Sequence, residues 1–423
     1  MLSKQENDLL TRVGPGTPMG ALMRRYWHPV AASGELDASP FRTKEVRILG
    51  EDLVLYRDRS GRLGLIDRWC PHRRVNMAYG VVEDDGLRCQ YHGWKFDATG
   101  ACTEQPFEET VHPDGRFREK CGVAAYRVEA RAGLVFAYLG PQPAPSLPAW
   151  EPLMWDNVVR DIAISELLCN WLQCQENSLD PVHAEWLHSF YGEYVQRIQG
   201  GVEQSPRIGN LRNHKKIGFD VFEYGIIKRR VIEGFTEEAE DWRTGHPVLF
   251  PNILLVGDRF ISTLQFRVPI DDERTFHVSL YTFCPAPGTR APVQASVPVR
   301  YVPLYNEGGD WNVDYTFNQD YMAWAQQGPI AERHREKLGE SDKGIILFRR
   351  QLKQQLARME AGLDPMNVFR DPSAAIRLPV EVIKIGGKQR PARYIPGEAG
   401  YSADAAKIEA VQATWDTLAE ARV

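Results

Sequence analysis

The chain has 423 residues, enough for two or three domains with a large buried core, and 43% of them are hydrophobic and 25% charged. Its formal net charge of -5 at pH 7 provides no basic footprint for nucleic acid or for an anionic membrane surface. No signal-peptide pattern opens the sequence, and no run of about 18 uncharged apolar residues could span a membrane. We therefore expect a cytoplasmic protein with small-molecule partners, without nucleic acid or membrane.

Three domains are predicted along the chain. Residues 1–42 are expected to form a helical lead-in that packs on the last domain, interrupted by a Gly-Pro-Gly-Thr-Pro turn at 14–18. Residues 43–145 contain short β-type runs, which predict an all-β domain. A proline-rich stretch near its end is the clearest linker, and residues 146–423 form the last domain.

The last domain is predicted to be α+β. Its helical pattern covers 319–359 and, at the end of the chain, 403–421. Strand-like runs precede these helices at 158–168, 219–231, 248–256, 260–268 and 276–283.

The second domain carries a paired motif of metal ligands, Cys70-x-His72 and Cys89-x-x-His92. This pattern is typical of a Rieske [2Fe-2S] site, in which two thiolates hold one iron and two imidazoles hold the other. Neutral nitrogen ligands raise the reduction potential above that of an all-cysteine cluster, and such a cluster passes one electron at a time.

A structural zinc ion is the alternative for these four residues, because zinc accepts the same donors. Zinc fingers usually pair cysteine with cysteine and histidine with histidine. Here each short loop offers one of each, and this order favours the Rieske cluster.

A second metal site is predicted in the last domain, at His183 and His188. A single histidine in an apolar segment is usually a satisfied core residue. Two imidazoles with one carboxylate, however, make the facial triad of non-haem Fe(II) oxygenases, which leaves positions open for dioxygen. The two histidines lie five positions apart, so both side chains reach one metal if the helix is locally irregular.

Two motifs together resemble those of the α (oxygenase) subunits of Rieske non-haem iron aromatic-ring oxygenases: Cys70-x-His72…Cys89-x-x-His92 and Glu176-Asn177-x-x-Asp180-x-x-His183-x-x-x-x-His188. The resemblance covers essentially the whole chain. It implies an α+β fold, with an all-β Rieske [2Fe-2S] domain and a helix-grip catalytic domain whose antiparallel sheet curves around a long helix. It implies a Rieske cluster and a mononuclear Fe(II) as cofactors, with O2 as cosubstrate.

The resemblance also implies roles for individual residues. His183 and His188 correspond to the iron-binding histidines. Asp180 corresponds to the carboxylate that hydrogen-bonds a cluster histidine of a neighbouring subunit and links the cluster to the catalytic iron. Asn177 lies where the family often has a polar side chain beside the iron, whereas Glu176 receives no role.

The third iron ligand is expected to be a downstream carboxylate, with Asp310, Asp314 and Asp320 as candidates. We choose Asp320 because residues 318–322 open a helix after a β-like stretch and resemble the family's ligand segment. Asp310 lies in a Gly-Gly-Asp turn. The alternative for Asp320 is an ordinary carboxylate at a helix N-terminus, where the macrodipole favours it.

Segments 14–20 and 319–350 resemble the branch of the family that contains phthalate dioxygenases and 5,5'-dehydrodivanillate O-demethylase. The resemblance implies O-demethylation of a methoxylated, lignin-derived biaryl acid with release of formaldehyde. It also implies a homotrimer or a hexamer of stacked trimers. The alternative within the family is cis-dihydroxylation of a phthalate-like carboxylate, and the alternative from another class is a Rieske electron carrier without catalytic iron.

No flavin or nicotinamide fingerprint follows a predicted strand, so NAD(P)H is expected to act indirectly, through a separate reductase with or without a ferredoxin. An aromatic acid substrate further predicts a cation in the last domain that binds its carboxylate. Most cations there are expected to be surface charges, and the candidates are Arg207, Arg212, Lys215, Lys216, Arg229, Arg230 and Arg243.

Overall fold

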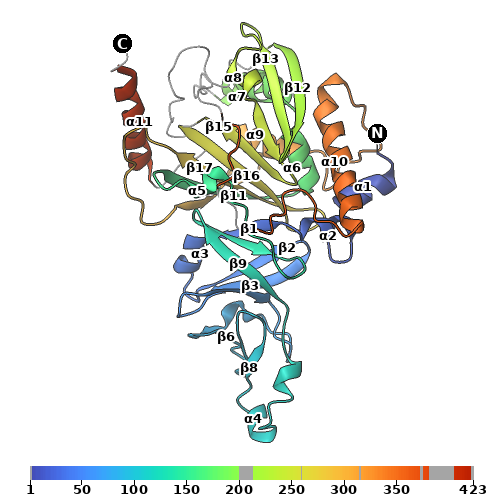
Figure 1. Cartoon of the computed structure of the whole chain (residues 1–423), viewed down its shortest axis with the longest axis vertical. Helices are drawn as coiled ribbons and strands as arrows, with labels where there is room; N and C mark the ends of the chain where they lie inside the picture. Colours follow the sequence, from blue (N-terminus) through green and yellow to red (C-terminus); the bar gives the residue numbers. More distant parts are fainter. Residues whose placement is uncertain are drawn as a thin grey trace. The chain divides into compact units, whose positions relative to one another are not determined.

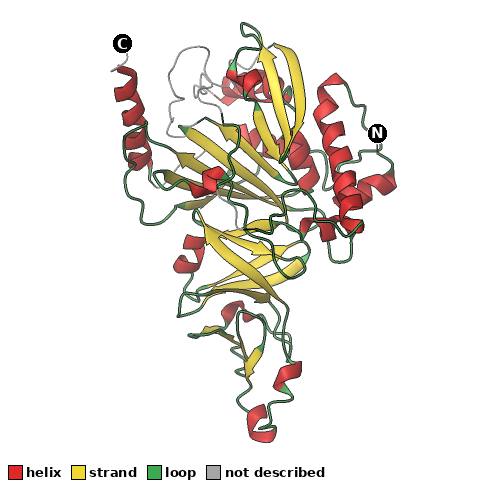
Figure 2. Ribbon diagram, in the orientation of Figure 1, coloured by secondary structure: helices red, strands yellow, loops and turns green. Residues whose placement is uncertain are grey.

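The computed structural model forms two compact units, each with its own sheets (Figures 1 and 2). The larger unit comprises Met1–Arg12, Pro148–Asn367 and Ser373–Val423, and the smaller one Val13–Leu147 and Val368–Pro372. Within the described residues, no helix is long and apolar enough to cross a membrane. The structure describes residues 2–199, 213–258, 260–313, 316–371, 375–380 and 404–420.

The smaller unit is built from two antiparallel sheets. The larger of them has the order β1 (Trp27–Ala32), β10 (Leu134–Tyr138), β9 (Ala125–Arg131), β4 (Leu63–Asp67), β3 (Glu51–Arg57) and β2 (Thr43–Ile48). The smaller one has the order β5 (Val81–Val82), β6 (Leu87–Arg88), β7 (Lys95–Phe96) and β8 (Cys102–Glu104). One buried core cluster contains Val54 and Ile66 from the first sheet, Phe96 from the second, and both Cys70 and Cys89.

The structure divides residues 1–42 differently from the prediction. Helix α1 (Lys4–Thr11) belongs to the larger unit, but α2 (Pro18–Met23), β1 and α3 (Ser33–Ala38) belong to the smaller one. Strand β1 pairs with β10 and is buried at all of its positions. Because both faces of β1 are covered, its sequence lacks the alternation that identifies a half-buried strand.

The larger unit contains an eight-stranded sheet that is antiparallel except at the β11–β18 pair, which is parallel. The predicted runs 219–231 and 248–256 each prove to contain parts of two strands of a hairpin. The strand order is β12 (His214–Phe222), β13 (Gly225–Ile232), β14 (His246–Leu249), β15 (Ile253–Gly257), β16 (Ile261–Pro269), β17 (Thr275–Phe283), β11 (Val159–Leu167) and β18 (Val299–Tyr301).

The two faces of this sheet have different chemistry. Strand register places Lys228 opposite His246, and Arg267 opposite His277, on one face. Along β11, β16 and β17 this face is polar yet buried, and helix α9 (Thr316–Ala325) packs against it, since the Tyr321 hydroxyl lies 3.1 Å from Nδ1 of His277. Neighbouring residues of β11, β16 and β17 point to the opposite face and are apolar, namely Ile162, Ile164, Leu264, Phe266, Val278 and Leu280.

A buried ion network holds helix α6 (Trp171–Asn177), the helix that leads to the histidine pair. Glu176 accepts hydrogen bonds from Nε of Arg333, at 2.9 and 3.2 Å, and from Nε of Arg349, at 2.6 Å. Arg349 lies on α10 (Lys343–Glu360) and also binds Glu336 through two hydrogen bonds. Arg333 further donates to Asn7 on α1, at 3.1 Å. Glu176 thus connects three segments that are distant in the sequence.

We expect Glu176→Ala to lower the free energy of unfolding of the larger unit by about 3–5 kcal/mol, because it leaves two buried guanidinium groups without this carboxylate. Urea denaturation of the full chain, followed by tryptophan fluorescence, measures the change. The control is Glu332→Ala, whose ion pair with Arg335 is exposed and contributes little to stability. Equal losses in the two variants would contradict the importance of the network.

Candidate metal centres

The two loops of the cluster motif have the same backbone hydrogen bonding. In each loop the cysteine N–H donates to the carbonyl five residues further on, and the cysteine carbonyl accepts from the N–H four residues further on, at 2.8–3.0 Å. The residue that closes each loop has a positive φ, 56° at Arg74 and 76° at Gly93. The two loops therefore present their cysteine and histidine side chains in equivalent ways.

The side chains of these loops separate into a sulfur pair and an imidazole pair. The thiols of Cys70 and Cys89 are hydrogen-bonded to each other, which raises the pKa of Cys70 and lowers that of Cys89 to about 6. The ring centroids of His72 and His92 lie 4.4 Å apart, and the ring of His72 stacks on that of Trp94. Nδ1 of His72 is buried without a hydrogen-bond partner in the described part of the chain. This donor set fits a cluster with two thiolate and two imidazole ligands.

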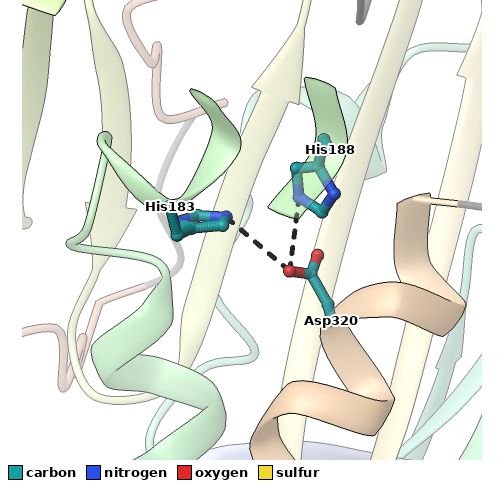
Figure 3. A group of neighbouring side chains, drawn as sticks. All are labelled: His183, His188 and Asp320. Carbon is teal, nitrogen blue, oxygen red and sulfur yellow. Dashed lines mark ion pairs between the residues drawn. The ribbon is translucent and has the colours of Figure 1, made fainter. Parts of the chain in front are cut away.

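The larger unit brings His183, His188 and Asp320 together, with ligand atoms that all lie within 4.8 Å of one another. Figure 3 shows both imidazoles directed at the same carboxylate oxygen. That oxygen, Oδ1 of Asp320, lies 3.6 Å from Nε2 of His183 and 3.3 Å from Nε2 of His188. Three donors around one point match the two-histidine, one-carboxylate set of non-haem Fe(II) sites.

A π-helix explains how histidines five residues apart can converge. Residues five apart on an α-helix point about 140° away from each other. Here η3 (Ala184–Phe190) is a π-helix, and His183 is its N-terminal capping residue. In a π-helix the hydrogen bonds join residues five apart, so the two side chains project from the same face.

Neighbouring groups leave Nε2 of each histidine available for a metal. Nδ1 of His183 lies 2.5 Å from the carbonyl oxygen of Asp180, and Nδ1 of His188 lies 3.0 Å from Oε1 of Gln319. Gln319 is itself oriented, because its Nε2 donates to the carbonyl of Val313. Both Nδ1 atoms therefore donate, and such partners commonly orient metal-binding histidines.

The charges of the three groups suit a divalent cation. Burial lowers the pKa of His183 to about 4, so its imidazole is neutral at pH 7. Burial opposes ionisation of Asp320, but His188 and His183 outweigh it and lower the pKa of the carboxyl. Burial also opposes the charged form of His188, yet Asp320 and Gln319 raise its pKa. Oδ1 of Asp320 is buried with no aligned hydrogen-bond donor among the described residues. A bound cation would compensate the negative charge of this oxygen.

Other residues singled out in the sequence lie outside this group. The carboxylate of Asp180 caps the following turn by accepting from the N–H groups of Val182 and His183. Asn177 contributes its carbonyl, which accepts from the N–H of Asp180. Asp310 is exposed in a turn, and Asp314 lies outside the described residues.

Several of the predicted carboxylate-binding cations hold surface ion pairs instead. Lys215 pairs with Glu233 and Lys216 with Glu237. Arg229 pairs with Asp220. Arg243 is exposed, and Arg207 and Arg212 lie outside the described residues.

Sequence comparisons give matches over nearly the whole chain. Residues 26–124 match the Rieske [2Fe-2S] domain, and residues 306–378 match the family described as LigXa C-terminal domain like. The chain is 48% identical to the 5,5'-dehydrodivanillate O-demethylase oxygenase subunit of Sphingobium sp. strain SYK-6, over 90% of this chain and 87% of that protein. It is 34% identical to the phthalate 4,5-dioxygenase oxygenase subunit of Pseudomonas putida, over 86% and 88%.

Comparison with solved structures supports the fold. NdmA of Pseudomonas putida CBB5 has a TM-score of 0.59 to this chain, with 84% of this chain and 98% of that chain covered at 19% identity. The domain match, the fold and the relatives define an oxygenase that uses a [2Fe-2S] cluster and a mononuclear iron. The chain belongs to the Rieske non-haem iron oxygenases, as the oxygenase (α) subunit of such a system. The predicted family, fold class, enzyme class and cofactors are thereby confirmed.

Gln319 was not identified from the sequence, and we expect Gln319→Leu to weaken Fe(II) binding about 10–100-fold, because Nδ1 of His188 loses the acceptor that orients it. Competition with a chromogenic iron chelator measures the affinity, while the cluster absorbance reports whether the smaller unit stays intact. The control, Gln326→Leu, changes an exposed glutamine just after α9. Unchanged iron affinity in Gln319→Leu would remove Gln319 from the site.

Proposed function

We propose that this chain is the oxygenase of an O-demethylase that acts on a methoxylated biaryl acid of lignin origin and releases formaldehyde. The observation that carries this proposal is the 48% identity, over 90% of the chain, to a protein named as a 5,5'-dehydrodivanillate O-demethylase oxygenase subunit. The reaction consumes one O2, two electrons and two protons, and converts the methyl ether into a phenol, formaldehyde and water.

In this proposal Cys70, His72, Cys89 and His92 hold the [2Fe-2S] cluster, and the iron site comprises His183, His188 and Asp320. Bound there, a ferrous ion supplies the means to activate dioxygen for attack on a methyl C–H bond. The protein groups around the site orient the metal-binding side chains and exclude bulk water from them.

Asp180 and Gln319 orient the two imidazoles through their Nδ1 atoms. Asn177 is proposed as a polar neighbour of the iron. The buried polar face of the sheet and helix α9 keep bulk water away from the carboxylate of Asp320.

Electrons are proposed to come from NAD(P)H through a separate reductase, with or without a ferredoxin. In support, both relatives are named as oxygenase subunits, which implies systems with further components. We further propose a homotrimer or a hexamer of stacked trimers, in which Asp180 receives a hydrogen bond from a cluster histidine of the adjacent subunit.

The second candidate is cis-dihydroxylation of a phthalate-like acid. The observation in its favour is the 34% identity to a phthalate 4,5-dioxygenase oxygenase subunit. Both reactions require the same iron site and the same electrons, so the product discriminates between them.

With a surrogate reductase, we expect the holoenzyme to release about one formaldehyde per O2 consumed from a methoxylated biaryl acid. Chromatography of the phenol and a colorimetric formaldehyde assay measure the products, with phthalate isomers and simple methoxybenzoates as comparison substrates. A cis-diol without formaldehyde would instead establish the dioxygenase. Both candidate functions would be contradicted by a fully loaded preparation that contains two irons per chain rather than three and takes up no O2 with any of these acids.

We expect Asp180→Asn to retain both metal centres but to lose turnover at least about tenfold, since the amide cannot replace a charged acceptor in the proposed electron path. Iron and sulfide content confirms metal loading, and single-turnover oxidation of the cluster measures electron transfer. Asp310→Asn, in an exposed turn, serves as the control. Normal cluster oxidation in Asp180→Asn would exclude the residue from the path.

A further inference from the structure

The alignment of His183 and His188 depends on the π-helical form of η3. π-Helices are rare and occur mostly as single turns at functional sites, so contacts with other segments are expected to hold this one in place. Among the described residues, the N-terminal cap of η3 makes no side-chain capping bond. If the segment relaxed to an α-helix, the two imidazoles would point about 140° apart and could not share one metal.

Glu185 lies between the two histidines on η3 and binds the beginning of strand β12 (Figure 1). Its Oε2 accepts a hydrogen bond from the backbone N–H of His214, at 2.8 Å, and lies 2.8 Å from Nδ1 of the same residue. Both side chains are shielded from water, since 14% of the Glu185 side chain and 5% of the His214 side chain are exposed. Two bonds to one shielded carboxylate are stronger than an exposed ion pair.

The His214 ring is oriented by this contact. Because a carboxylate only accepts hydrogen bonds, Nδ1 of His214 carries the proton, and Nε2 is buried without a partner in the described part of the chain. The backbone of His214 is paired with Ile232 of β13, at the edge of the eight-stranded sheet. Glu185 therefore connects η3 to the sheet, and it is not a member of the group that surrounds the candidate metal position.

We propose that Glu185 is a positioning residue of the iron site, which keeps η3 in its π-helical form by binding His214. The inference rests on the iron site of the proposed function and does not depend on the identity of the substrate. Glu185 fixes the turn between the two imidazoles, whereas the bonds at their Nδ1 atoms orient each ring separately. Loss of the contact lowers the metal affinity and changes the coordination geometry of the metal that still binds.

The test replaces the mononuclear iron by Co(II), whose EPR spectrum reports coordination geometry while the oxidised [2Fe-2S] cluster is EPR-silent. The full chain with its cluster intact is titrated with Co(II), and Kd is measured by calorimetry. Glu185→Ala should weaken binding about 10–100-fold and alter the EPR spectrum at saturation. Glu185→Gln should lose less, because its amide oxygen still accepts from His214. The control, Glu233→Ala, removes a carboxylate that binds Asn213 and Lys215 on either side of His214, and should change neither readout.

A second substitution distinguishes this contact from a general loss of stability. Adding His214→Ala to Glu185→Ala should cause no further loss, because the ring has already lost its acceptor. If Glu185→Ala does not fold, as judged by cluster absorbance, Glu185→Gln and His214→Ala give the same comparison. Unchanged Co(II) affinity, weaker affinity with an unchanged spectrum, additive losses in the double variant, or equal losses in Glu233→Ala would overturn the role. An unaltered chain that binds no Co(II) would instead contradict the iron site itself.

Discussion

The larger unit is organised around one buried carboxylate, Asp320, whose oxygen faces two imidazole nitrogens. A buried anion is destabilising unless a cation or several donors compensate it. The helical segments that surround Asp320 accordingly supply oriented nitrogens: a π-helix aligns His183 and His188, and the preceding turn and Gln319 accept their Nδ1 hydrogens. The three groups surround a point that a divalent cation would fit.

The two faces of the central sheet contribute differently to this arrangement. Its apolar face supplies the buried area that stabilises the fold, while its other face places Arg267, His277 and Lys228 in the interior. Such polar residues contribute little to stability and are destabilising when left unpaired. The larger unit tolerates these residues because other parts of it supply stability, namely its apolar core and the hydrogen bonds of Glu176 with Arg333 and Arg349.

Sequence reasoning predicted both candidate metal sites because most of their donors lie in short stretches with a characteristic spacing. It could not identify Gln319, since the contact to His188 depends on a π-helix that no local pattern signals. It passed over Glu185, because the contact with His214 joins residues 29 positions apart and forms only when β12 lies beside the π-helix. It also missed β1, whose uniformly buried residues give no alternation.

The contact between Asn7 and Arg333 has a consequence for how the chain is made. Helix α1 leaves the ribosome before the smaller unit, but its partner Arg333 lies 186 residues beyond Leu147, where the main segment of that unit ends. The smaller unit consists of the continuous segment Val13–Leu147 and one short later segment, Val368–Pro372. Most of this unit can therefore fold during synthesis. The larger unit must wait until α10 has emerged, and α1 remains without its network for most of translation. Cluster insertion can therefore begin while the catalytic half is still unfinished.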